Sequence, residues 1–284
     1  MAADLAARIE QALGRRPRRL ARMSGGCIAE IHRVELEGGD LVVAKLGRAP
    51  GALLTEAWML RYLRQHSALP VPDVLHVDDD LLLMSFIAGG DALDDSAERH
   101  AAELLAALHD VTAPRFGLER DTLIGGLRQP NPPTESWLVF FAEQRLLHMA
   151  REAHDAGRLP AATLRRIETL AGRLDRWLAE PSRPSLIHGD MWGGNVLAKG
   201  GRIAGFVDPA IYYADPEIEL AFSTLFSTFG RAFFARYEAL RPLRPGFFEE
   251  RRDLYNLYPL LVHARLFGGG YPASVARTLD RFGA

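Results

Sequence analysis

The stretch His188-Gly189-Asp190-Met191-Trp192-Gly193-Gly194-Asn195, followed by Val207-Asp208-Pro209, decides the fold of this chain. Asp190 and Asn195 lie in a glycine-rich loop after one expected strand, and Asp208 ends the next expected strand, 13 residues after Asn195. A tight hairpin between these two strands would bring the three side chains together. The sequence therefore predicts a cluster of two carboxylates and one amide.

This set of side chains suits phosphoryl transfer. Carboxylate and amide oxygens are ligands that Mg²⁺ takes, with phosphate and water completing its shell. One carboxylate can stay free to orient a hydroxyl group and accept its proton. We therefore expect Asn195 and Asp208 to hold Mg²⁺ and Asp190 to act as the base. The alternative, a polar surface hairpin, is disfavoured because several residue types must coincide at fixed spacings.

The pattern H-x-D-x-x-x-x-N, then a strand, then D, resembles the catalytic loop and metal-binding aspartate of protein kinases. It departs from that pattern at Gly189, where kinases have Arg, and at Pro209, where they have Phe. The resemblance implies a two-lobed α+β, protein-kinase-like fold with ATP between the lobes. Residues 1–87 would form an N-terminal lobe with an antiparallel sheet, one helix and the hinge, and residues 88–284 a mostly helical C-terminal lobe.

Hydrophobic patterning predicts the elements of both parts. Helices are expected at 2–13, 53–65, 95–111, 137–156 and 161–178, the third of them starting at Asp95 with Glu98 in a capping box. Strands are expected at 28–36, 41–46, 81–87, 185–188 and 203–207. The Arg-rich segment 15–22 is interpreted as a solvated basic surface.

The N-terminal part offers partners for ATP. Lys45 ends an expected strand and is one of only two lysines, and Glu56 follows 11 residues later in a helix, placed to pair with it. Gly25, Gly26 and Cys27 precede a strand, where a loop over the phosphates would lie. The alternatives are a surface lysine at a strand end and a simple turn.

The segment between the two parts is expected to bind adenine. It consists of Met84, Ser85, Phe86 and Ile87, whose backbone would hydrogen-bond the base. ATP and Mg²⁺ are therefore the expected cofactors.

Several stretches are similar to the fructosamine/ketosamine 3-kinases of the aminoglycoside-phosphotransferase-like superfamily. They are Leu186–Asn195, Val207–Leu220 and Leu266–Gly270, and the similarity runs from Gly25 to Tyr271. The resemblance implies that ATP phosphorylates the 3-hydroxyl of a ketosamine, formed on a small amine or a protein lysine. The phosphate promotes elimination of the adduct, which is deglycation. The alternatives are a kinase of another alcohol, such as an aminoglycoside or a choline-like amine, or a nucleotide-binding protein without turnover.

Five further residues are assigned roles. Trp192 is a candidate to stack on the sugar, and Trp137 is a second substrate candidate, although each could instead pack in the helical part. His188 is expected to hold the loop through backbone hydrogen bonds, and Glu219 to support the metal loop from behind. His109 is interpreted as an ordinary helix-face residue.

Composition narrows the class of protein further. The 284 residues carry 34 basic and 36 acidic side chains, a net charge of −2 that disfavours nucleic-acid binding. No apolar run is long enough to span a membrane, and the first residues lack the apolar core of a signal peptide. The single cysteine, Cys27, fits a cytoplasmic monomer. Its oxidation, including a disulfide-linked dimer, is hypothesised to inhibit the enzyme reversibly.

Overall fold

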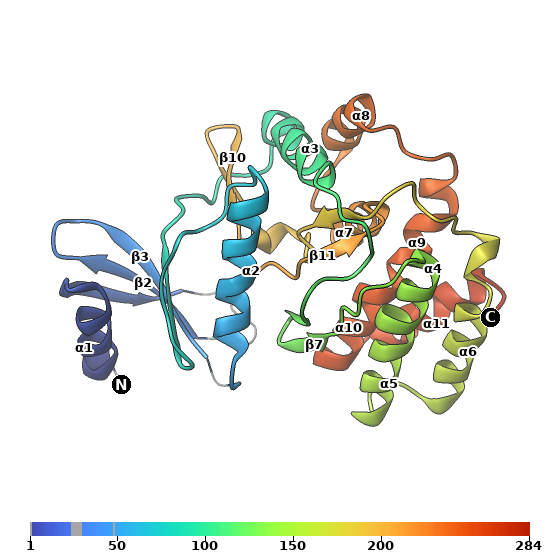
Figure 1. The fold of residues 1–284 in the computed structure, drawn as a ribbon, viewed down its shortest axis with the longest axis horizontal. Coiled ribbons are helices and arrows are strands. Elements are labelled where there is room, and N and C mark those ends of the chain that lie inside the picture. The colour runs from blue at the N-terminus through green and yellow to red at the C-terminus, as the bar shows by residue number, and fades with distance from the viewer. Residues whose placement is uncertain (1, 24–29, 48) are drawn as a thin grey trace.

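The computed structural model describes residues 2–23, 30–47 and 49–284. A twisted sheet near the N-terminus and a larger helical part form the two ends of an elongated molecule (Figure 1). The expected α+β organisation is confirmed. The expected loop residues Gly25, Gly26 and Cys27 lie outside the described residues.

The N-terminal sheet is antiparallel, with strand order β1-β2-β3-β5-β4. Its strands are β1 (Pro17–Arg22), β2 (Glu30–Leu36), β3 (Leu41–Leu46), β4 (Val74–Val77) and β5 (Leu81–Ser85). Helix α1 (Ala2–Leu13) and helix α2 (Ala52–His66) carry apolar stripes at helical spacing. The predicted helices at 2–13 and 53–65 are therefore confirmed.

The two faces of β3 serve different purposes because side chains alternate along a strand. Val42 and Ala44 are buried in a small core with Leu5 and Ile9 of α1. Lys45 lies on the opposite face and reaches Glu56 of α2. Because side chains alternate between the two faces of a strand, Lys45 points away from α1 and toward α2.

The Arg-rich segment 15–22 is not simply a basic surface, as the sequence indicated: most of it forms the edge strand β1. Leu20 packs against the small core under α1, while Arg18 and Arg19 are exposed. Long arginine stems can cover a sheet edge while their charges stay in water. Strand β4 was also missed.

The larger part is built mainly from helices. These are α3 (Asp95–His109), α4 (Trp137–Phe140), α5 (His148–Asp155), α6 (Ala161–Ala171), α7 (Glu217–Leu225), α8 (Arg231–Leu240), α9 (Arg252–Tyr255), α10 (Leu257–Phe267) and α11 (Tyr271–Arg281). A π-helical segment, Phe141–Leu147, joins α4 to α5, so the predicted helix at 137–156 is continuous but irregular. The cap of α3 is Asp94 rather than the predicted Asp95: its side chain accepts the Ser96 and Ala97 N–H groups. No described helix has the length and apolar character needed to cross a lipid bilayer.

Short strands between the helices carry the decisive motif. They are β6 (Thr122–Ile124), β7 (Leu127–Gln129), β8 (Ser185–Ile187), β9 (Val196–Lys199), β10 (Arg202–Phe206) and β11 (Tyr212–Ala214). The predicted hairpin between 185–188 and 203–207 is wrong. Strand β10 pairs with β9, and β8 pairs with β11, so the loop at 188–195 lies between two separate ladders.

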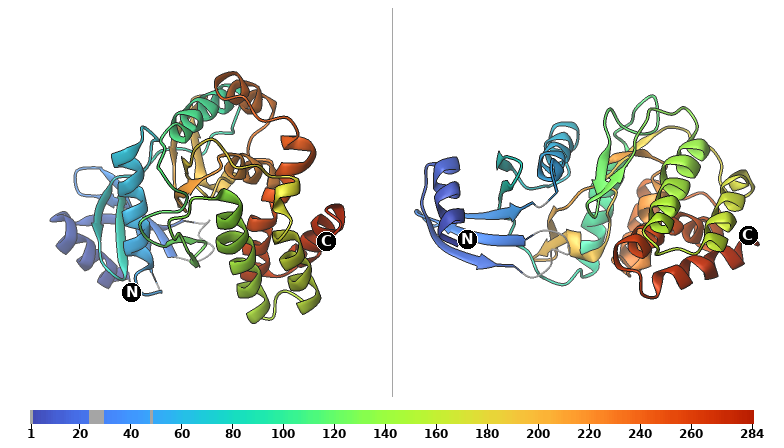
Figure 2. Two further views of the ribbon diagram at one scale, coloured as in Figure 1. Left: turned by 45° about the vertical axis from the view of Figure 1, so that its right-hand side comes forward. Right: turned by 90° about the horizontal axis from the view of Figure 1, so that it is seen from below.

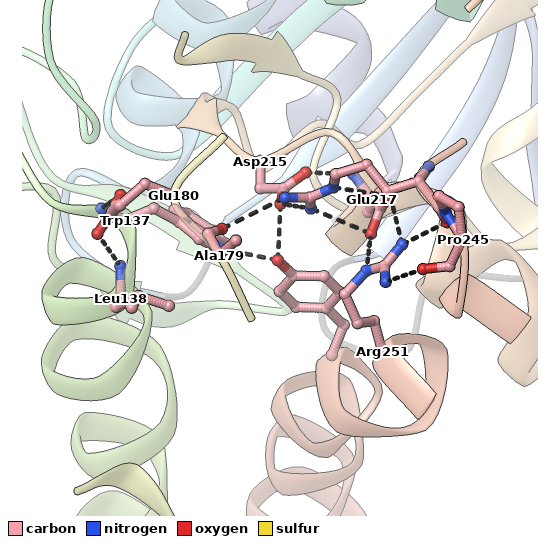
Figure 3. Close-up of polar contacts among 10 residues, drawn as sticks. Trp137, Leu138, Ala179, Glu180, Asp215, Glu217, Pro245 and Arg251 are labelled. Carbon is pink, nitrogen blue, oxygen red and sulfur yellow. Dashed lines mark hydrogen bonds and ion pairs between the residues drawn. The ribbon is translucent and has the colours of Figure 1, made fainter. Parts of the chain in front are cut away.

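A buried ionic network anchors the start of α7. Glu217 accepts the Arg251 Nε–H at 2.6 Å, and Asp215 accepts hydrogen bonds from Arg244 and from the Tyr255 hydroxyl. Figure 3 shows Glu217 and Arg251 facing each other. Asp215 and Glu217 therefore have a structural role, and the network fixes the helix that carries Glu219.

Candidate active site

The loop after β8 is locked against the segment that follows β10. The Ala210 N–H donates to the His188 carbonyl at 2.7 Å, and a His188 ring nitrogen donates to the Val207 carbonyl at 3.1 Å. Gly189 has φ +87°, and a Cβ there would overlap the Ala210 carbonyl. Only glycine fits this close crossing. The structural role predicted for His188 is confirmed.

Glu219 supports the loop from inside the helical part. Its carboxylate accepts the Gly189 N–H at 2.7 Å and a His109 ring N–H at 2.9 Å, and the other His109 ring nitrogen lies 2.6 Å from the Tyr237 hydroxyl. His109 is fully buried, so its interpretation as an ordinary helix-face residue was wrong. This line of hydrogen bonds holds the backbone just before Asp190.

Asp190, Asn195 and Asp208 line one cleft, as predicted. The Asn195 side-chain N–H donates to the backbone carbonyl of Asp190 at 2.9 Å, and the Val207 N–H donates to the backbone carbonyl of Asn195 at 3.1 Å. Burial raises the pKa of Asp190 to about 7, opposed by its hydrogen bond with Asn195 and reinforced by the negative charge of Asp208. A carboxylate in this range is poised to accept a proton near neutral pH.

Lys45 joins the sheet to the loop. Its ammonium lies 2.7 Å from a Glu56 oxygen and 2.9 Å from an Asp208 oxygen, and about a tenth of each of the Lys45 and Glu56 side chains is exposed. Burial opposes the charge on Lys45, but the two carboxylates outweigh it and raise its pKa above the usual range. The predicted ion pair is confirmed, and the contact with Asp208 was not predicted.

The donor set fits a divalent cation bound together with phosphate. Asn195 directs its amide N–H at the backbone, which leaves its oxygen free to act as a ligand. The Asp208 carboxylate is 41% exposed, and Lys45 occupies only one of its oxygens. No described group of three His, Cys, Asp or Glu residues could hold a metal by itself. Two oxygen ligands are what Mg²⁺ needs when a nucleotide supplies the rest.

A cleft of about 900 Å³ contains these residues. Its lining includes Lys45, Glu56, Asp190, Asn195 and Asp208, together with Trp192 and the glycines after it. Residues 123–127 of the β6–β7 hairpin also line the cleft. The hairpin lies between α2 and the end of α10 (Figures 1 and 2). Trp192 is 36% exposed, as a residue that stacks on a ligand would be.

Trp137 does not line the cleft, contrary to prediction. It is fully buried, packs against Phe140 and Phe141, and donates its ring N–H to the Tyr255 hydroxyl at 2.9 Å. Glu180 accepts its backbone N–H at the start of α4, as Figure 3 shows. Trp137 is therefore a core residue. The prediction failed because helical spacing alone does not say whether a helix face meets the core or a cavity.

The predicted adenine segment is partly engaged within the sheet. The Ser85 N–H donates to the Asp73 carbonyl at 2.9 Å and the Phe86 N–H to the Leu41 carbonyl at 3.3 Å. Met84 is buried in the core. The lining of the described cleft does not include residues 84–87, so their contact with adenine stays a prediction.

The fold and the site together define a phosphotransferase of the protein-kinase-like class. Solved structures agree on the fold: a macrolide 2′-phosphotransferase superposes with a TM-score of 0.66 at 18% identity, covering 98% of this chain and 96% of that one. At this identity the likeness concerns the fold alone.

The chain belongs to the fructosamine kinase family, whose model matches residues 1–283. The probable ketoamine kinase of Synechocystis sp. is 35% identical over 91% of this chain and 88% of its own length. The chloroplastic protein-ribulosamine 3-kinase of Arabidopsis thaliana is 30% identical over 93% of this chain and 82% of its own. A Thermobifida fusca structure designated fructosamine-3-kinase has a TM-score of 0.85 at 33% identity over 98% of both chains. The protein is therefore an ATP-dependent kinase of ketosamines.

Proposed function

We propose that the protein transfers the γ-phosphoryl group of ATP to the 3-hydroxyl of a ketosamine, with Asp190 as the base. The observation that carries this assignment is that Asp190, a half-buried carboxyl group with a pKa of about 7, lines the same cleft as Lys45 and Asp208. Asp190 would orient the hydroxyl and take its proton as the bond to phosphorus forms.

The remaining charged groups of the cleft serve the nucleotide. Lys45, held by Glu56, is placed to neutralise the phosphate oxygens of ATP. Asn195 and Asp208 are the proposed ligands of Mg²⁺, which when bound supplies positive charge to the phosphates. Adenine is proposed to lie against residues 84–87, and Trp192 against the sugar of the acceptor.

Phosphorylation at the 3-hydroxyl explains deglycation chemically. A phosphate is a far better leaving group than hydroxide, so the 3-phosphate makes the sugar adduct prone to elimination, and the amine is then released. Both small amines and protein lysines are possible sources of the amine. A cytoplasmic location and a monomeric state complete the proposal.

An acceptor screen tests the proposal. The purified protein is incubated with ATP, Mg²⁺ and fructosamine, ribulosamine or erythrulosamine adducts of one amine, and ADP release and ³¹P spectra are recorded. We expect a phosphate ester at carbon 3 of at least one adduct, and turnover lower by about a hundredfold or more with Asp190→Asn. Preferential phosphorylation of an aminoglycoside, or of a different hydroxyl, would refute the assignment.

A further inference from the structure

One end of the cleft is lined by aromatic rings from three helices. Phe222 and Phe226 come from α7 and the residue after it, His263 and Phe267 from α10, and Tyr271 begins α11. We call these five residues the aromatic wall. The His263 ring lies 4.9 Å from the Phe226 ring, 4.9 Å from the Tyr271 ring and 5.6 Å from the Phe267 ring, measured between centroids. The wall is therefore one continuous surface.

Two rings of the wall are well exposed, although Phe222 is buried. Phe226 is 37% and Phe267 46% exposed, and Trp192 in the same cleft is 36% exposed. Single exposed apolar side chains are common, but a contiguous patch in a cavity indicates a binding surface. Because the cleft is continuous from this wall to Asp190, whatever covers the wall lies beside the reacting hydroxyl.

The two ends of the cleft differ in the charge of the side chains that line them. Among the described residues that line it, full charges belong to Lys45, Glu56, Asp190 and Asp208, all at the phosphate end. His263 donates its Nδ1–H to the Pro259 carbonyl at 2.7 Å, and burial lowers its pKa, so the ring is neutral with Nε2 as an acceptor. The wall thus offers aromatic faces and two neutral polar groups, the His263 Nε2 and the Tyr271 hydroxyl, and its five residues include no carboxylate that could bind a polycation.

We propose that the aromatic wall binds the group carried by the amine of the ketosamine and selects adducts of amines with an apolar or aromatic substituent. This inference rests on the proposed function. The sugar lies beside Asp190 and Trp192, and the amine substituent extends along Phe226 and Phe267. A protonated secondary amine also interacts favourably with aromatic faces.

Kinetics with a matched acceptor pair test the proposal. The fructosamines of ethanolamine and of benzylamine carry the same sugar and differ only in the amine substituent. Burial of a phenyl ring favours binding by about tenfold to a hundredfold. We therefore expect kcat/KM for the benzylamine adduct to exceed that for the ethanolamine adduct by at least about tenfold, mainly through KM.

Two variants locate the effect. Phe226→Ala and Phe267→Ala should each reduce the ratio of the two kcat/KM values severalfold, because the ring that covers the benzyl group is gone. Phe248→Ala is the matched control, since Phe248 is 39% exposed and does not line the cleft. It should retain the wild-type ratio. A thermal melt of each variant confirms that it is folded.

The outcomes are distinct. Phosphorylation of both adducts with a ratio near one overturns the inference and leaves the proposed function standing. A high ratio that Phe226→Ala and Phe267→Ala leave intact also overturns it. If neither fructosamine is phosphorylated, the same ratio is measured with the ribulosamines and erythrulosamines of the two amines, and a ratio near one there overturns the inference. If no ketosamine of either amine is phosphorylated, the proposed function fails and the inference fails with it.

Discussion

Replacing Asp190 with Asn should stabilise the nucleotide-free protein while abolishing its activity. The substitution keeps the shape of the side chain but removes a buried negative charge beside Asp208 and Glu219. The amide cannot accept the proton of the acceptor hydroxyl, so kcat should fall by about a hundredfold to ten-thousandfold. A catalytic residue whose charge destabilises the folded state is expected to show this combination of gained stability and lost activity when it is replaced.

The magnitude follows from the pKa of Asp190. Folding raises this pKa from 3.8 to about 7, and a difference of one pKa unit corresponds to about 1.4 kcal/mol, which gives about 4 kcal/mol at most. Partial exposure of Asp190 in the cleft reduces this to about 2 kcal/mol at pH 8. Because the folded state binds the proton more tightly, this destabilisation of the wild type grows from about pH 4 to pH 7 and then levels off.

Thermal unfolding of wild type and Asp190→Asn at pH 5 and pH 8 measures the effect. At about 2–4 °C per kcal/mol for a chain of this size, we expect the variant to melt roughly 4–8 °C higher at pH 8 and by less than half as much at pH 5. Turnover is followed by ADP release with a ketosamine. A variant that melts like the wild type at pH 8, or turns over normally, would refute the reasoning.

Three further predictions concern the metal ligands, Lys45 and the ionic network at the start of α7. Asp208→Ala should shift the Mg²⁺ concentration for half-maximal turnover upward more than Asn195→Ala does, and equal or absent shifts would contradict the metal assignment. Lys45→Met should raise KM for ATP at least tenfold with the KM for the ketosamine little changed, in initial-rate kinetics; an unchanged KM for ATP would remove Lys45 from the phosphate site. Glu217→Gln leaves the buried Arg251 without its charge partner, so it should cost about 3 kcal/mol and lower Tm by roughly 6–12 °C, and a Tm within 2 °C of wild type would show that the network is not important for stability.

Which residues meet at the phosphate end of the cleft could be predicted, because this depends on residue types at short spacings. A strand followed by a helix is enough to predict the pair of Lys45 and Glu56. A loop between short strands is enough to predict the cluster of Asp190, Asn195 and Asp208. Their support could be predicted only in part. Glu219 was expected behind the loop, whereas His109 could not be found, because its partners Glu219 and Tyr237 lie more than a hundred residues away.

Strand pairing failed for a related reason. The expected partner of the strand at 185–188 was the next strand in sequence, but the true partner β11 has only three residues, Tyr212–Ala214, and begins just after the site motif. A run of three residues is too short to show the alternation of apolar and polar residues that predicts a strand. Trp137 was misplaced because a tryptophan near a helix start fits a core and a cavity equally well until the facing elements are known.

Acceptor choice is the part of this enzyme that the fold leaves open. The same architecture occurs in a macrolide phosphotransferase at 18% identity, so the shape shared by the two proteins does not select the alcohol. The phosphate end of the cleft comes from two local clusters, Lys45 with Glu56 and Asp190 with Asn195 and Asp208. The aromatic wall instead takes its rings from α7 and the residue after it, α10 and α11. Phe222 with Phe226 and His263 with Phe267 each show the spacing of four that places rings on one helix face. The sequence does not show that these two helix faces meet in the cleft, because this depends on how α7 and α10 pack. The substrate preference can therefore be inferred only from the folded structure.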